Sequence, residues 1–133
     1  MKTIQLLNEK NHFLENFYSL NEKQLIYLTA GRFDQVELFY NQREDILKII
    51  KYIDSEIAKT QELESNMDMK ISDSDREAVK ECLKTKDIFV SRIIEQDVQI
   101  ISLIEKLKNN IITELKTVRN ARKLLAGYKS NVA

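Results

Sequence analysis

The chain has 133 residues, of which 32% are charged and 43% hydrophobic, and its 21 basic and 21 acidic residues give a formal net charge of zero. This length suits one domain with a modest core, and the balanced charge provides no general attraction to nucleic acid or to a membrane. We expect a cytoplasmic protein, because no apolar run approaches the ~20 residues of a membrane span, the first residues lack a signal peptide, and a single cysteine fits a reducing compartment.

Residues that favour turns are scarce in this chain. It contains no proline and only two glycines, and apolar residues recur at helical spacing through most of its length. We therefore predict an all-α fold, an antiparallel up-down-up bundle of three long helices in a single domain over residues 1–133.

The first two predicted helices are joined by a short turn. The first covers residues 2–30 and has the wide apolar stripe of a helix that contacts two neighbours. Gly31 is the expected C′ residue of this helix, and Asp34 is the expected N-cap of the second helix, over 35–64. So short a turn makes the two helices antiparallel.

The third predicted helix, over 75–126, is much longer than the others. A polar loop over 65–73 precedes it, and Ser74 with Glu77 has the spacing of a capping box. Its apolar residues alternate in steps of three and four, which indicates a helix packed against other helices. In its first part, the predicted buried residues are Val79, Leu83, Val90, Ile93 and Ile100.

The register of the second and third helices follows from the loop between them. If this loop is centred near residue 70, the numbers of facing residues sum to about 140 in an antiparallel pair. Each apolar row has one strong polar interruption, Arg43 in the second helix and Asp97 in the third. Because these two numbers satisfy the sum, we predict an ion pair between them; the alternative is that each side chain reaches water separately.

The same register predicts that the third helix overhangs the bundle. The second helix starts opposite residue 105, so about twenty residues, or roughly 30 Å of helix, have no partner in the chain. This part keeps an apolar stripe, which an isolated helix in water does not keep without cover. The predicted partner-binding residues are Ile104, Leu107, Ile111, Ile112, Leu115, Val118, Arg119, Arg122, Leu125 and Tyr128.

Two features of this region leave alternatives open. Asn109 and Asn110 are poor helix formers, so the chain could bend there into a fourth helix folded over the bundle. The residues from Lys106 onward are mostly basic, which either complements the dipole at the end of a helix or serves an acidic partner. Nucleic acid is disfavoured, because the chain has no net charge and this region has almost no aromatic residues.

No set of residues has the pattern of a catalytic or metal site. Glu9 and His12 have the spacing of a di-iron ligand motif, but such sites need two motifs, and His12 is the only histidine. Cys82 lies on an apolar face, which is typical of a packed thiol. We expect no enzyme and no cofactor. The candidate site is a surface that binds another amphipathic helix.

Three segments carry a recognisable pattern. One begins with Gly31-Arg32-Phe33-Asp34 and continues with Val36, Phe39, Arg43, Ile46, Leu47 and Ile50. Another is Ile93-Ile94-Glu95-Gln96-Asp97-Val98-Gln99-Ile100, and the last is Arg122-Lys123-Leu124-Leu125-Ala126-Gly127-Tyr128. These segments resemble the G-x-F/W-D…R-x-x-L-L pattern, the I-L-x-x-D-x-x-I segment and the basic-apolar-Tyr ending of FliT/FlgN-type flagellar type III export chaperones.

The resemblance implies a cytoplasmic helical chaperone. Such a protein binds an amphipathic helix of a secreted flagellar subunit, the filament cap protein in the FliT branch or a hook–filament junction protein in the FlgN branch. It prevents aggregation of that subunit and delivers it to the export ATPase complex or the export gate. We expect no nucleic acid, no membrane, and a monomer or weak homodimer. The alternative is a homo-oligomeric structural adaptor, helical or coiled-coil, in which the same stripe pairs with a second copy.

Overall fold

The computed structural model describes residues 1–67 and 70–132, with the side chains of the second range as far as residue 127. These residues form three helices, α1 (Lys2–Thr29), α2 (Val36–Asn66) and α3 (Asp73–Val132), and no strand. The helices have 28, 31 and 60 residues. The predicted all-α fold and the greater length of the third helix are confirmed. The predicted loop over 65–73 is shorter, and its residues 68 and 69 lie outside the described range.

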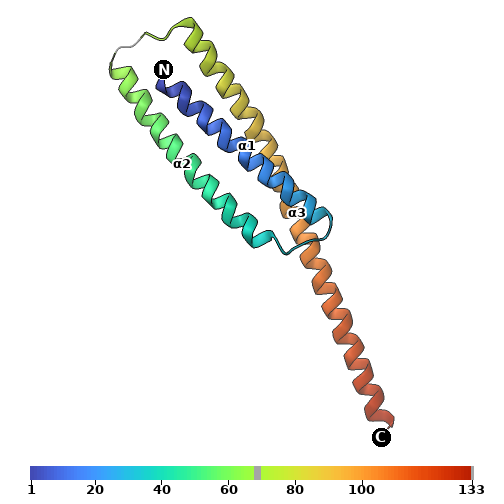
Figure 1. Cartoon of the computed structure of the whole chain (residues 1–133). Helices are drawn as coiled ribbons and strands as arrows, with labels where there is room; N and C mark the ends of the chain where they lie inside the picture. Colours follow the sequence, from blue (N-terminus) through green and yellow to red (C-terminus); the bar gives the residue numbers. More distant parts are fainter. Residues whose placement is uncertain (68–69, 133) are drawn as a thin grey trace. The chain divides into compact units, whose positions relative to one another are not determined.

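The chain divides into two units, Met1–Ile100 and Ile101–Ala133. In the first unit, α1, α2 and the first part of α3 run alongside one another as a three-helix bundle (Figure 1). The second unit contains the rest of α3. Residues 1–100 thus form a unit of their own, and the single domain over 1–133 stays a prediction.

Gly31 ends α1 in the predicted C′ position. Its φ of 76° lies in the left-handed region, where glycine lacks the Cβ that penalises other residues. The Arg32 amide donates a hydrogen bond to the Tyr27 carbonyl (2.9 Å), and the Gly31 amide donates one to the Leu28 carbonyl (3.0 Å). These two bonds form a Schellman motif, which satisfies carbonyls at the end of α1 and turns the chain toward α2.

The predicted N-cap of α2 is wrong. The capping residue is Gln35, and no side chain caps this helix end. The Asp34 carboxylate instead accepts hydrogen bonds from the guanidinium of Arg32 (3.1 Å) and the side-chain amide of Gln35 (3.3 Å). These contacts, with Arg32 contributing most, lower the pKa of Asp34, and the same carboxylate raises the pKa of Arg32. The Asp34 carboxylate therefore stabilises the turn and does not cap the backbone amides of α2.

The start of α3 is also capped by a different residue from the predicted one. Ser72, not Ser74, accepts a hydrogen bond from the Asp75 amide at its Oγ (3.1 Å). This is the contact that an N-cap serine makes with the third residue of a helix. The helix consequently begins at Asp73, two residues before the predicted start.

The core of the bundle is small and partly polar. Phe17 and Ile50 are buried with Leu14 and Ile93 in one apolar cluster. The other buried apolar residues are Leu7, Leu28, Phe39, Ile53, Cys82 and Ile100. The buried polar residues are Thr3, Asn21, Gln24, Thr60 and Gln96.

The buried face of α3 is rotated relative to the predicted one. Ile93 and Ile100 are buried as predicted, and Val79 is half-buried, but Leu83 and Val90 are exposed. Their places in the core are taken by the residues that precede them, Cys82 and Phe89, of which the second is half-buried.

Polar partners on α1 account for this rotation. The Cys82 thiol donates to Asn8 Oδ1 (3.2 Å), and the Cys82 carbonyl accepts a hydrogen bond from Asn11 Nδ2 (3.0 Å). Gln96 Nε2 donates to the Tyr18 carbonyl (3.2 Å). Because buried polar groups need hydrogen-bond partners, the row of α3 that meets these groups faces inward, although it is less apolar than the row beside it.

The ion pair predicted from the register is present. Arg43 Nη2 of α2 lies 2.7 Å from Asp97 Oδ2 of α3, and each side chain is 23% exposed. The other carboxylate oxygen, Oδ1, accepts a hydrogen bond from Asn21 Nδ2 of α1 (3.1 Å). The Arg43 guanidinium also lies over the ring of Phe17, 5.2 Å from its centroid. One carboxylate thus connects all three helices at the same level.

We expect the two charges to be energetically coupled. Arg43→Ala and Asp97→Ala should each lower the free energy of unfolding by about 1.5–3 kcal/mol, the range for hydrogen bonds to charged groups, because each leaves the other charge unpaired. The double variant should lose less than the sum, by about 0.5–3 kcal/mol. Urea denaturation of the four proteins measures this coupling, and strict additivity would show that the pair contributes none.

Neighbouring isoleucines test which face of α3 is buried. Ile93 is 8% exposed and Ile94 is 59% exposed. Ile93→Ala should therefore cost about 2–5 kcal/mol of stability, whereas Ile94→Ala should change it by less than about 0.5 kcal/mol. If Ile94→Ala were the more damaging change in urea denaturation, α3 would bury a different face from the one that holds Ile93 in the structure.

Candidate functional site

The candidate site is an apolar row on the second unit, which we call the α3 stripe. It consists of Ile104, Leu107, Ile111, Leu115, Val118 and Leu125. Ile104 and Leu107 are half-buried, and every described side chain from residue 108 to residue 127 is exposed. Leu115 and Leu125 have 59% and 61% of their surface exposed. The end of α3 therefore presents a row of large apolar side chains to solvent.

α3 continues through Asn109 and Asn110 without a break. Thr113 Oγ1 donates a hydrogen bond to the Asn109 carbonyl (2.9 Å), and Thr117 Oγ1 donates to the Thr113 carbonyl (3.0 Å). Such bonds to the preceding turn satisfy the hydroxyls within the helix. The alternative of a separate fourth helix, starting at the two asparagines, is not adopted.

Helical geometry places the remaining predicted site residues beside the stripe. Residues three and four apart share a face of a helix, so Arg122 interrupts the stripe between Val118 and Leu125. Ile112 and Arg119 lie along one flank of it, and both are exposed. Tyr128 belongs to α3, but its side chain lies outside the described range.

The stripe is accompanied by an excess of positive charge. One acidic residue, Glu114, lies between residues 106 and 127. The basic residues in this range are Lys106, Lys108, Lys116, Arg119, Arg122 and Lys123. None of them forms an ion pair within the part of the chain that the structure describes. These charges are therefore available to an external partner.

Among the described residues, those with metal-ligand or nucleophile chemistry do not assemble into a site. The ring of His12 packs edge-on against Phe13, with centroids 5.5 Å apart, and the Cys82 thiol is buried against Asn8. No group of three or more His, Cys, Asp or Glu side chains among the described residues could hold a metal ion. The described part of the chain also lacks a helix with the length and apolar character needed to cross a membrane.

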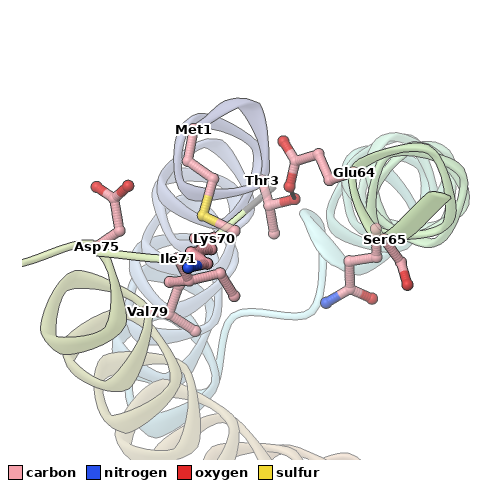
Figure 2. Close-up of a pocket in the computed structure, with 9 residues that line it drawn as sticks. Met1, Thr3, Glu64, Ser65, Lys70, Ile71, Asp75 and Val79 are labelled. Carbon is pink, nitrogen blue, oxygen red and sulfur yellow. Dashed lines mark hydrogen bonds between the residues drawn. The ribbon is translucent and has the colours of Figure 1, made fainter. Parts of the chain in front are cut away.

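A cavity of about 500 Å³, which no pattern in the sequence predicts, lies at the end of the bundle where the chain begins (Figure 2). Its lining residues are Met1, Thr3, Gln61, Glu64, Ser65, Lys70, Ile71, Asp75 and Val79. Thr3 Oγ1 donates to Glu64 Oε2 (2.8 Å), and Asp75 lies on the opposite side of the cavity from this pair (Figure 2). The lining comes from all three helices and the α2–α3 connection, so no local motif could have revealed it. The carboxylates of Glu64 and Asp75 therefore do not form a pair that could share a proton.

The α3 stripe should be dispensable for folding. Ile111 and Leu115 are both exposed, so the double variant Ile111→Asp/Leu115→Asp should unfold within about 0.5 kcal/mol of the wild type, as exposed substitutions usually do. Urea denaturation followed by tyrosine fluorescence measures this. A loss of several kcal/mol would mean that these side chains pack within the folded chain and are not free to bind a partner.

Comparisons with models of protein families, with curated proteins and with solved structures find no match for the chain. The candidate site therefore rests on the residues themselves, on their exposure and on the charges around them.

Proposed function

We propose that the protein is an export chaperone of the FliT/FlgN type, which binds an amphipathic helix of a secreted flagellar subunit on the α3 stripe. The observation that carries this proposal is the exposure of the stripe. Its members from Ile111 to Leu125 are large apolar side chains in contact with solvent, repeated at the spacing of one helical face. A contiguous apolar surface of this kind marks an interaction site.

A helix of the client would pack its own apolar face along the stripe. Amphipathic helices recognise one another in this way, through apolar residues at helical spacing. Full burial of a leucine or isoleucine side chain contributes about 1.5–3 kcal/mol, so the exposed members of the stripe can offset the cost of ordering the client helix. The same contact removes the client's apolar face from water, which prevents its association with other unfolded chains.

Two residues of the FliT/FlgN-like segments support the proposal through their structural roles. Gly31 forms the left-handed turn that separates α1 from α2. Arg43, in the same segment, binds Asp97 of the second segment and thereby connects α2 to α3. The proposed clients are the filament cap protein or a hook–filament junction protein. The proposed next step is transfer in the cytoplasm to the export ATPase complex or the export gate, with no catalytic step by this chain.

A pull-down from a flagellated host tests the proposal. The wild type should retain a filament cap or junction subunit, and Ile111→Asp/Leu115→Asp should lose it. Loss of two buried apolar side chains costs about 3–6 kcal/mol, so the affinity for the purified subunit should fall by at least about 100-fold.

The matched control is Leu124→Asp. Leu124 is exposed on the same helix but lies on the other side from the stripe, so this variant should bind the client like the wild type. If the double variant keeps the same partners as the wild type, the stripe is not the client site. If the wild type is instead a stable dimer that the double variant converts to a monomer in sedimentation experiments, the stripe pairs with a second copy and the adaptor alternative holds.

A further inference from the structure

Four of the six basic residues between residues 106 and 127 lie along one edge of the α3 stripe. Successive residues of an α-helix are rotated by about 100°. Relative to Ile111, Lys108 and Arg119 therefore lie roughly 60–80° to one side, and Lys116 and Lys123 lie roughly 120–140° to the same side. We call these four residues the basic edge. All four are exposed.

The opposite edge of the stripe has a different character. Within roughly 60–120° of Ile111 on that side lie Asn110, Glu114, Thr117 and Ala121, which include one acid and no base. The other two basic residues reduce this asymmetry without removing it, because Arg122 lies in the stripe itself and Lys106 lies roughly 140° from Ile111 on the side away from the basic edge.

Neither of the simpler explanations for these charges predicts a one-sided arrangement. Cations near a helix C-terminus interact with the helix dipole wherever they lie around the axis, so the dipole does not select one edge. A membrane surface surrounds an amphipathic helix on both flanks of its apolar face, and helices that bind there carry lysine and arginine across the polar face. A partner that is itself a helix meets the two edges separately, and it can therefore be acidic on one edge alone.

We propose that the partner of the α3 stripe is an amphipathic helix with carboxylates along one edge of its apolar face, and that the basic edge selects the direction in which this helix binds. This inference rests on the proposed function, since it concerns the same site. Reversing a bound helix end for end exchanges its two edges. An acidic edge that lies beside Lys108 and Arg119 in one direction lies beside Glu114 in the other. Charge pairing therefore favours one direction.

The preference should be moderate, because the basic edge is exposed to solvent. Exposed ion pairs contribute little individually, and salt screens them. Four such pairs, not all at ideal geometry, should favour the matched direction by about tenfold. High salt should remove this preference while the apolar contact remains.

Designed peptides provide the test. Each is a helical peptide with the same apolar row and the same number of glutamates. The first carries the glutamates on one edge of the row, the second carries them on the other edge, and the third divides them between both edges. A fourth peptide has glutamine in place of every glutamate. A photoreactive group at the N-terminus of each peptide records its direction, because mass spectrometry locates the cross-link along residues 101–127.

The first and second peptides should bind in opposite directions, so their cross-links should appear at opposite ends of this segment. The third should bind about threefold more weakly than either, because it keeps half of the charge pairs. The inference is overturned if the first two cross-link at the same end, if both cross-link at both ends equally, or if the third binds as tightly as they do.

Variants of the chain separate the inference from the proposed function. Neutralising the basic edge in Lys108→Gln/Lys116→Gln/Arg119→Gln/Lys123→Gln should weaken the one-edged peptides by about tenfold and leave the glutamine peptide unchanged. The matched control Lys106→Gln should change neither. If every peptide binds the basic-edge variant and the wild type equally, only the inference fails. If every peptide binds the wild type no more tightly than it binds Ile111→Asp/Leu115→Asp, both the inference and the proposed function fail.

Vesicles of phosphatidylserine and phosphatidylcholine test the lipid alternative. The wild type should not sediment with them. If the wild type sediments with the vesicles and the basic-edge variant does not, these cations bind anionic lipid, and the inference is overturned.

Discussion

The bundle depends on one carboxylate that serves two helices at once. Asp97 of α3 accepts a charged hydrogen bond from Arg43 of α2 and a neutral one from Asn21 of α1. A partly buried charge of this kind adds little net stability, but its loss leaves polar partners without hydrogen bonds. A shift of α3 along either neighbour would separate Asp97 from both partners. The contact therefore favours one register of the three helices. This matters because several buried residues of the core are polar, so apolar packing alone specifies the register less strongly.

The polar contacts between α1 and α3 explain why an apolar row remains exposed on the bundle. Cys82 and Gln96 face inward because α1 presents Asn8 and the Tyr18 carbonyl to them. Their apolar neighbours, including Ile94, consequently face solvent. Exposed isoleucine or leucine on α3 is thus not by itself evidence of a binding site. The α3 stripe differs from these residues in its length, in its regular spacing and in the charges beside it, which form no ion pair among the described residues.

In the second unit, apolar contact and charge play different parts. The stripe from Ile104 to Leu125 provides area, and area supplies most of the free energy when one helix packs on another. The basic edge that includes Lys108 and Arg119 adds little energy because water screens it, but it distinguishes the two sides of the stripe. The proposed chaperone function would benefit from this combination, since the apolar part would set the affinity and the charges would set the direction of the bound helix.

Periodicity and spacing in the sequence alone determined the all-α class, the turn at Gly31 and the register that pairs Arg43 with Asp97. These features are local, or they follow from the length of one loop, so they can be derived from residue order. The rows of residues that form the α3 stripe and its basic edge follow in the same way, because side chains on one helix have a set angular relation.

Only the tertiary structure decided which of two adjacent rows on α3 is buried. Cys82 and Phe89 compete with Leu83 and Val90 for the core, and hydrophobicity alone does not select the row that is buried. The choice depends on hydrogen-bonding groups of α1, which lie far away in the sequence. The use of Ser72 rather than Ser74 as a cap, and the cavity near Met1, were likewise not apparent, because both depend on where the chain places groups in space.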